Sequence, residues 1–352
     1  MAEMAPALPA FKVGYYEKNL TTVVHAETGL SVWVPVASNH DGAPVESYKL
    51  VFSERKLLRN FGMDIGCLPD AQSFELPSAA YSATPKDAAS PRGIVLYLHG
   101  LGAHRWDFYK LCEELASEGY IVASPGFANS GANTRKDVNG SYGGATKLFP
   151  ESLALRVHTT ERVRDHLVET YGALPLGVIG HSMGAITASF LSWDVPKVKI
   201  SGGVGPDGFA PAFAKDIIPY SEEGRTEPWP VTQGSASLVF ASRSLDMFFP
   251  ETLQAGFTFE RIDLPDEKPE SIPKGELPTH CMVTADGITH TSWLVNFNTH
   301  GLQKLTFLSF LKEKLGLDPF GVWGTPNERA HALADNAMKP LIKRFFAQHL
   351  KK

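Results

Sequence analysis

The residue best placed by its neighbours to act as a nucleophile is a serine that has a glycine two positions before it and another two positions after it. Gly180, Ser182 and Gly184 form the pattern G-x-S-x-G. Glycine at both outer positions removes the side chains that would clash in a tight turn from a strand into a helix. An apolar run at 176–179 precedes the turn and a small-residue apolar segment follows it, as the pattern requires. The sequence therefore predicts Ser182 as a nucleophile at the top of a sheet; a solvent serine in an ordinary turn is the alternative.

A serine hydroxyl is a poor nucleophile at neutral pH, so it needs a histidine to take its proton and an acid to orient that histidine. After a strand–turn–helix nucleophile, the acid and then the histidine follow along the chain. We expect the base to be His290, in a glycine-containing loop after the last predicted strand. His280 is the weaker rival because it stands at the start of that strand. His181 directly precedes Ser182, and His99 begins a second glycine-containing turn at 99–102. Both histidines are predicted to adjust local geometry.

The acid has two main candidates. Asp207 follows the strand after the nucleophile helix, and Asp246 follows the next strand. Both stand at the carboxyl ends of predicted parallel strands, from which a carboxylate can reach the histidine. Periodicity does not choose between them. Asp286 is a third and weaker candidate.

An acyl-transfer site also needs two backbone N–H groups aimed at the developing oxyanion, and removing one such donor costs on the order of 3 kcal/mol. Met183, directly after the nucleophile, supplies one candidate N–H. Leu101 supplies the other, in the glycine-flanked turn at 99–102 that follows the first long strand. A plain strand-to-helix loop is the alternative interpretation of 99–102.

The elements that must position these residues alternate between buried strands and helices. This alternation predicts an α/β protein with a mostly parallel central sheet and helices on both faces. Apolar runs predict strands at 93–98, 120–125, 176–179, 198–204, 236–241 and 281–284, and periodic segments predict helices at 106–118, 150–170, 293–315 and 328–350.

We expect one domain at 11–350 after a disordered lead-in at 1–10. The first part contains β-rich runs at 22–25 and 30–35 and a Ser/Ala/Pro-rich surface loop at 70–89. Glycine-rich, irregular or proline-rich composition predicts loops, a cap or insertions at 128–149, 207–233 and 262–279.

Composition limits the partners. The 352 residues carry 33 Lys and Arg against 38 Asp and Glu, a net charge of −5 without a basic block, so we expect no nucleic-acid partner. Three scattered cysteines, Cys67, Cys112 and Cys281, show neither metal-ligand spacing nor a disulfide framework. With no signal peptide or membrane span in the sequence, we expect a cytoplasmic protein that uses neither metal nor cofactor. The composition sets no oligomeric state.

Two motifs give the chain a family resemblance. The segment 99–105, HGLGAHR, looks like the H-G-L-G-A-x-R segment of the platelet-activating-factor acetylhydrolases, the group VII phospholipases among the α/β-hydrolases. The segment 180–184 is similar to their G-H-S-x-G-G turn, with Ala185 in place of the second glycine. Weaker similarities, at 11–14 with 30–35, at 203–207 and at 287–290, extend the resemblance over about residues 11 to 350.

The resemblance implies an α/β-hydrolase fold and a serine ester hydrolase acting on a phospholipid-like ester with a short or oxidised acyl chain. It favours Asp207 as the acid, whereas related polyester hydrolases and dienelactone-hydrolase-like esterases would favour Asp246. The segments 128–147 and 264–278 do not look like the family. An esterase for a bulky lipid, pigment or polyester and a non-catalytic ligand-binding protein of the same fold are the alternatives.

Contact with a lipid surface is a further expectation left open. Trp106, Phe108 and Tyr109 begin a predicted helix near the oxyanion turn. Aromatic side chains there could dip weakly into a membrane surface, or they could belong to the protein core.

Overall fold

The computed structural model describes residues 11–21, 27–52, 72–100, 103–127, 145–200, 236–240, 260–264, 272–285 and 332–350. The predicted lead-in at 1–10, the run at 22–25, most of the loop at 128–149, the cap at 207–233 and the helix at 293–315 lie outside these ranges.

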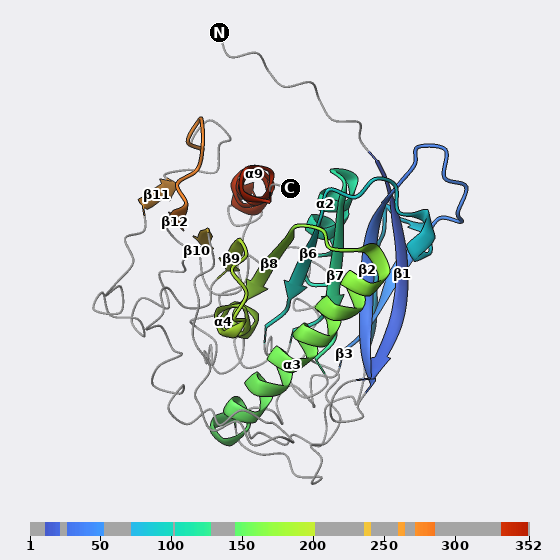
Figure 1. Cartoon of the computed structure of the whole chain (residues 1–352), viewed down its shortest axis with the longest axis horizontal. Coiled ribbons are helices and arrows are strands. Elements are labelled where there is room, and N and C mark those ends of the chain that lie inside the picture. The colour runs from blue at the N-terminus through green and yellow to red at the C-terminus, as the bar shows by residue number, and fades with distance from the viewer. Residues whose placement is uncertain are drawn as a thin grey trace, which may run out of the picture.

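A ten-stranded sheet organises the described part of the chain, in the order β11-β12-β10-β9-β8-β6-β7-β2-β1-β5 (Figure 1). The strands from β11 to β7 are parallel, and β2 pairs antiparallel with both β7 and β1. The mostly parallel sheet is therefore confirmed. The strands are β1 (Lys12–Thr21), β2 (Glu27–Val36), β5 (Tyr81–Ser82), β6 (Gly93–Leu98), β7 (Tyr120–Pro125), β8 (Leu176–His181), β9 (Lys197–Ile200), β10 (Ser237–Phe240), β11 (Glu260–Leu264) and β12 (His280–Ala285).

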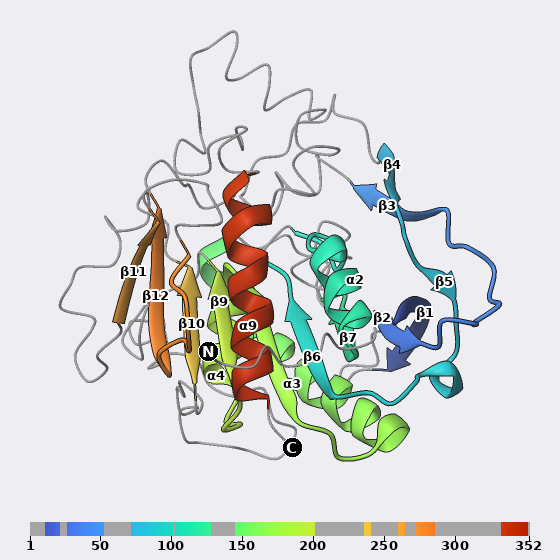
Figure 2. The ribbon, with the colours of Figure 1, turned by 90° about the horizontal axis from the view of Figure 1, so that it is seen from above.

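Helices cover both faces of the sheet (Figure 2). Every residue of β6 and β7 is buried, as expected of parallel strands between two helical layers. Alternate β6 side chains enter different cores: Val95 and Tyr97 share one with α2 (Tyr109–Ser117) and α9 (Lys339–His349). Ile94, Leu96 and Leu98 share the other with α3 (Ala145–Tyr171) and α4 (Met183–Phe190).

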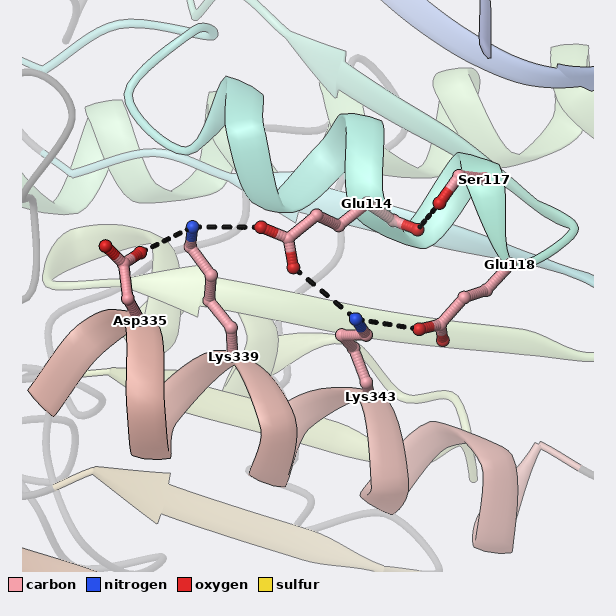
Figure 3. A network of polar contacts seen from close by, with 6 residues as sticks. All are labelled: Glu114, Ser117, Glu118, Asp335, Lys339 and Lys343. Carbon is pink, nitrogen blue, oxygen red and sulfur yellow. Dashed lines mark hydrogen bonds and ion pairs between the residues drawn. The ribbon is translucent and has the colours of Figure 1, made fainter. Parts of the chain in front are cut away.

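Ion pairs fix the last helix on α2 (Figure 3). Glu114 lies between two lysines of the C-terminal helical segment, at 2.9 Å from Lys339 Nζ and 3.5 Å from Lys343 Nζ. Lys343 also pairs with Glu118 at 2.8 Å, and Lys339 with Asp335 at 2.7 Å. The helix predicted at 328–350 is confirmed over 332–349, with a π-helical turn at Ala334–Met338 before α9.

The prediction of a surface loop at 70–89 is wrong. This stretch contains β4 (Gln72–Pro77), which forms a two-stranded sheet with β3 (Ser47–Phe52), and also β5 and a 3₁₀ turn at Pro85–Asp87. β5 extends the main sheet beside β1, and Leu76 and Ala83 are buried. Local Ser and Pro content indicates a loop, but strand pairing and burial override that local preference.

Two predicted boundaries also move. The helix expected to begin at Pro150 starts at Ala145, within the predicted loop 128–149, because a proline near a helix start marks a preference rather than a limit. The insertion predicted at 262–279 overlaps β11, whose residues 262–264 pair with β12. Residues 272–279 contain no regular element.

Cys112 and Cys281 are buried thiols without a disulfide, and Cys67 lies outside the described residues. Among the described helices, none combines the length and apolar character needed to cross a membrane.

Candidate active site

The turn between β8 and α4 holds Ser182 in an unusual backbone conformation. Its φ is 52° and its ψ is −120°, outside the regions that L residues normally occupy. In the part of the chain that the structure describes, Ser90 is the only other non-glycine residue with positive φ. The N–H of Ser182 donates to the carbonyl of Ile200 at 2.9 Å, and the Ser182 carbonyl accepts the N–H of Ala185 at 2.9 Å. The predicted strand–turn–helix is therefore present, with its strain concentrated on the serine.

Both glycines of the motif are sterically required. A Cβ on Gly180 would lie 2.5 Å from the backbone N of Ala185, and a Cβ on Gly184 would lie 2.6 Å from the carbonyl carbon of Leu98. Atoms of the backbone cannot move aside as a flexible side chain can. The two glycines let α4 pack against the ends of β6 and β8, and this packing holds the serine turn in place.

The segment after β6 lies directly beside this turn. A Cβ on Gly100 would be 3.0 Å from Cβ of Ser182 and 3.1 Å from Nδ1 of His181. The structure thus brings the start of the predicted oxyanion turn, His99 and Gly100, against the nucleophile turn. Leu101 and Gly102, which complete that turn, lie outside the described residues.

His99 is buried and has defined hydrogen-bond roles. Burial, with a further contribution from the positive charge of Arg156, holds its pKa well below the usual value, so the ring is neutral. The N–H of Phe127 donates to Nε2 at 3.3 Å, which assigns the proton to Nδ1, 2.8 Å from the carbonyl of Gly100. His99 therefore braces its own turn, in agreement with the prediction that it adjusts local geometry.

Residues 103–108 form a compact turn before α2. The N–H of His104 donates to the buried carboxyl group of Asp107 at 2.9 Å, and burial raises the pKa of Asp107 to about 8, against the lowering effect of that hydrogen bond. Arg105 donates to Ser31 at 2.8 Å and to Glu17 at 3.0 Å, which ties the turn to β1 and β2. These contacts hold the stretch that follows Gly102.

The aromatic residues beside this turn belong to the core. Trp106, Phe108 and Tyr109 are 5%, 2% and 0% exposed, so they present no surface to a lipid. Trp106 Nε1 donates to the Tyr15 hydroxyl at 3.0 Å, and its ring stacks on His104. Of the two interpretations of this stretch, the core one is therefore confirmed for these three side chains.

Several predicted site residues fall where the structure gives no description. Leu101, Asp207, Asp246, Asp286 and His290 all lie outside the described ranges. Met183, the other predicted oxyanion donor, begins α4 directly after Ser182. His280 begins β12, as expected of the weaker rival. Among the described residues, no group of three His, Cys, Asp or Glu side chains is placed to hold a metal ion.

Sequence reasoning missed Arg156 and Thr187. Arg156 lies on α3 and is 1% exposed, yet it reaches the carbonyl of His99 with Nη2 and Thr187 Oγ1 with Nε at 3.1 Å. A signal was available. Arg156 falls on the apolar stripe of its helix, between Leu153 and Thr160, where a charged residue is expected only with a specific partner.

The family of the chain follows from its sequence. The profile of the alpha/beta hydrolase family matches residues 95–305, more than half of the chain and including the serine turn. The chain belongs to the α/β-hydrolase family. No protein of curated function matches the sequence significantly.

Solved structures of two esterases resemble this one at low sequence identity. A ferulic acid esterase from Streptomyces cinnamoneus is 16% identical with a TM-score of 0.51, over 99% of this chain and 92% of its own. A carboxyl esterase from Bacillus coagulans is 14% identical with a TM-score of 0.32, over 58% of this chain and 49% of its own. The first similarity supports the α/β-hydrolase fold over nearly the whole chain.

Proposed function

We propose that this α/β-hydrolase is a serine-dependent carboxylester hydrolase with Ser182 as its nucleophile. The observation that carries the proposal is the backbone of Ser182, at φ 52° and ψ −120° between two glycines that tolerate no Cβ. A strained serine at a sharp strand-to-helix turn presents its hydroxyl above the sheet, which is the requirement for attack on a bound ester.

Strand order supports His290 as the general base. β9 and β10 separate β12 from β8, so at ordinary strand spacing the ends of β8 and β12 are about 15 Å apart. His290 is five positions beyond the end of β12 (290 − 285 = 5). Five residues of extended chain span up to about 17 Å, so His290 is within reach of Ser182.

The same argument leaves two acids. Asp207 is seven positions beyond β9 (207 − 200 = 7), and Asp246 is six beyond β10 (246 − 240 = 6). Both strands lie between β8 and β12, so either carboxylate can approach a histidine placed between those strands. We propose Asp207, which the family resemblance favours, with Asp246 as its rival.

The oxyanion hole is proposed from two backbone N–H groups. The first N–H of an α-helix has no acceptor within its own helix, so the N–H of Met183 is available at the start of α4. Leu101 is bonded to Gly100, which lies against Ser182. Two donors aimed at the same developing charge supply the largest single share of stabilisation in many acyl-transfer sites.

The reaction follows from these roles. Ser182 Oγ attacks the ester carbonyl while His290 takes its proton, and the N–H groups of Leu101 and Met183 bind the oxyanion. The intermediate then expels the alcohol, which receives the proton from His290. Water, deprotonated by His290, attacks the acyl-enzyme, and the free acid leaves with Ser182 restored. Asp207 keeps the imidazole oriented and stabilises its protonated form.

The ester itself is proposed from the resemblance to the platelet-activating-factor acetylhydrolases: a phospholipid-type ester with a short or oxidised acyl chain. Hydrolysis of a bulkier lipid, pigment or polyester ester is the alternative, and the ferulic acid esterase of the same fold adds a phenolic ester to be tried. A panel of p-nitrophenyl acetate, butyrate and palmitate, methyl ferulate and a short-chain phosphatidylcholine distinguishes these substrate classes.

The panel is run on the wild type and on Ser182→Ala, Asp207→Asn and Asp246→Asn, with Ser192→Ala, an exposed serine just after α4, as the control. We expect Ser182→Ala to lose at least about 1,000-fold in kcat and one of the two Asn variants to lose a comparable factor, because the members of a triad act as a unit. Full p-nitrophenyl acetate hydrolysis by Ser182→Ala would overturn the proposal. Failure of Ser182 to react with a fluorophosphonate would favour the non-catalytic alternative.

A further inference from the structure

A buried arginine connects the two segments that flank the nucleophile. Arg156 approaches from α3, and its Nη2 donates to the carbonyl of His99, at the end of β6. Its Nε donates to Thr187 Oγ1 at 3.1 Å, in the second turn of α4. The guanidinium group also lies 3.9 Å from the centre of the Phe127 ring, just beyond β7. One side chain therefore touches three of the loops and helices that follow the strand ends.

Thr187 extends this connection to the first residue of α4. Its hydroxyl accepts from Arg156 and donates its own proton to the carbonyl of Met183 at 2.8 Å. The chain of contacts runs from the carbonyl of His99 through Arg156 and Thr187 to Met183. Its two ends are the segments that carry the proposed oxyanion donors, since Leu101 is two residues beyond His99.

Stability alone does not call for a cation at this position. Removing a guanidinium from water costs several kcal/mol, and replacing buried charges by apolar side chains of similar volume is often neutral or stabilising. Burial lowers the pKa of Arg156 to about 9, so the group is still a cation near neutral pH. What a guanidinium supplies, and an apolar side chain does not, is a planar set of donors with fixed angles between them.

We propose that Arg156, acting with Thr187, is a positioning residue that sets the spacing between the backbone of His99 and Gly100, where the predicted oxyanion turn begins, and Met183 at the start of α4. This inference rests on the proposed esterase function and assigns a further residue to the same site. N–H donors stabilise an oxyanion only when they are held about 2.7–3.1 Å from its position. A small shift between the two segments therefore weakens binding of the transition state more than binding of the substrate.

The test compares Arg156→Met, Arg156→Lys, Thr187→Val and Thr187→Ser with the wild type. Active sites are first counted by titration with a fluorophosphonate, so that kcat is expressed per reactive Ser182. We expect kcat per site to fall roughly 10- to 100-fold in Arg156→Met and Thr187→Val, less than the loss of a whole donor. KM should stay within about threefold, and a trifluoromethyl ketone transition-state analogue should bind more weakly by the same factor as kcat/KM falls.

The conservative variants act as a rescue. Thr187→Ser keeps the hydroxyl and should retain most of the activity, whereas Arg156→Lys keeps the charge but not the fork, and should fall between the wild type and Arg156→Met. Arg164→Met is the matched control: Arg164 is on the same helix, pairs with Asp165 and is partly exposed. It should keep the wild-type kcat per site.

A merely structural arginine would give a different result: fewer titratable sites and a lower melting temperature, but an unchanged kcat per site and unchanged analogue affinity. That result overturns the inference while leaving the esterase proposal intact. If Arg156→Met does not fold, a wild-type kcat per site in Thr187→Val overturns it equally. If the wild type shows no hydrolysis that depends on Ser182, both proposals fail.

Discussion

Gly100 lies against Ser182, so closely that a Cβ on the glycine would stand 3.0 Å from Cβ of the serine. The contact joins the end of β6 to the end of β8, two strands that are neighbours in the sheet. A side chain at Gly100 would fit only if the predicted oxyanion turn and the nucleophile turn moved apart by a few tenths of an ångström. The geometry of the site therefore depends on backbone meeting backbone at this point.

Substituting alanine for the glycines around this contact should give graded losses. Gly100→Ala needs a shift of only a few tenths of an ångström, so we expect a folded protein with kcat reduced about tenfold by the displaced turn. Gly184→Ala would press a methyl group into the carbonyl of Leu98, and should cost about 3 kcal/mol or more of unfolding free energy. Urea unfolding and ester hydrolysis measure the two effects.

Gly126→Ala is the control for both variants, because the nearest atom to its new methyl group would be the Gly29 carbonyl oxygen at an ordinary 3.4 Å. It should change neither kcat nor stability by much. A Gly100→Ala enzyme with unaltered kcat would contradict the close coupling of the two turns.

The backbone strain at Ser182 should be measurable as stability. Replacing Ser182 by glycine removes the Cβ that disfavours positive φ, so Ser182→Gly should be more stable than Ser182→Ala by about 1 kcal/mol. Both variants should be inactive. Ser90, exposed and at φ 46°, is the matched control: Ser90→Gly should exceed Ser90→Ala by a similar amount and keep full activity. Equal stability of Ser182→Gly and Ser182→Ala would show that the turn stores no strain.

Because Trp106 is packed in the core, replacing it should lower the stability of the fold without changing how much protein associates with lipid vesicles. Trp106→Ser removes a buried ring and its hydrogen bond to Tyr15, so we expect a cost of about 3–5 kcal/mol in unfolding free energy. Co-sedimentation with phosphatidylcholine vesicles should be the same for the variant and the wild type. A selective loss of vesicle binding at unchanged stability would instead place Trp106 at a lipid surface.

The sequence determined the central sheet well because buried parallel strands leave a strong local pattern. The runs at 93–98 and 120–125 became β6 and β7 without a change of boundary, and Gly119, which directly follows the helix predicted at 106–118, has a φ of 97°. The edges were harder. β4 and β5 are short polar or mixed segments. They form strands by pairing with β3 and β1 respectively, which are distant in sequence.

The site was predictable to a similar limit. The serine turn is recognisable from a short local motif, so sequence alone finds it, although Gly184 is required by the carbonyl of Leu98 on the neighbouring strand. The role of Arg156 depends on contacts that bring α3 against His99, at the end of β6, and against Thr187 of α4, a tertiary relationship that no local pattern encodes. The Trp106 segment carried both a surface and a core interpretation because an apolar stripe does not say whether it faces lipid or protein.

A buried lysine in the middle of the sheet predicts how stability changes with pH. Lys199 is 0% exposed, and its Nζ has no hydrogen-bond partner among the described residues. Burial lowers its pKa from 10.5 to about 8, because the cation is disfavoured away from water. The folded protein therefore releases a proton that the unfolded chain still holds between about pH 8 and pH 10.5.

The sign of the effect follows from this difference. Since the unfolded chain binds more protons in that window, stability rises as pH increases from 8 to 10.5 and is lost as pH falls back through it. Lys199→Met removes the titrating group, so it should be more stable than the wild type by about 3 kcal/mol at pH 7 and by little above pH 10.5. Lys197, two residues away on the same strand, also has its pKa lowered, to about 7, by burial and then by Lys199, against the opposing charge of Asp194. Its proton is therefore held more tightly once Lys199 is replaced.

Urea unfolding at pH 7, 8.5, 9.5 and 10.5 tests this prediction as a difference between variant and wild type, which cancels the tyrosines and cysteines common to both. Lys110→Met, at an exposed position on α2, is the matched control and should leave the pH dependence unchanged. The difference between Lys199→Met and wild type should shrink steadily as pH rises, since the wild-type lysine becomes neutral in the unfolded chain as well. A stability difference that stays constant across the four pH values would mean that folding does not lower the pKa of Lys199. Its Nζ would then be solvated or paired.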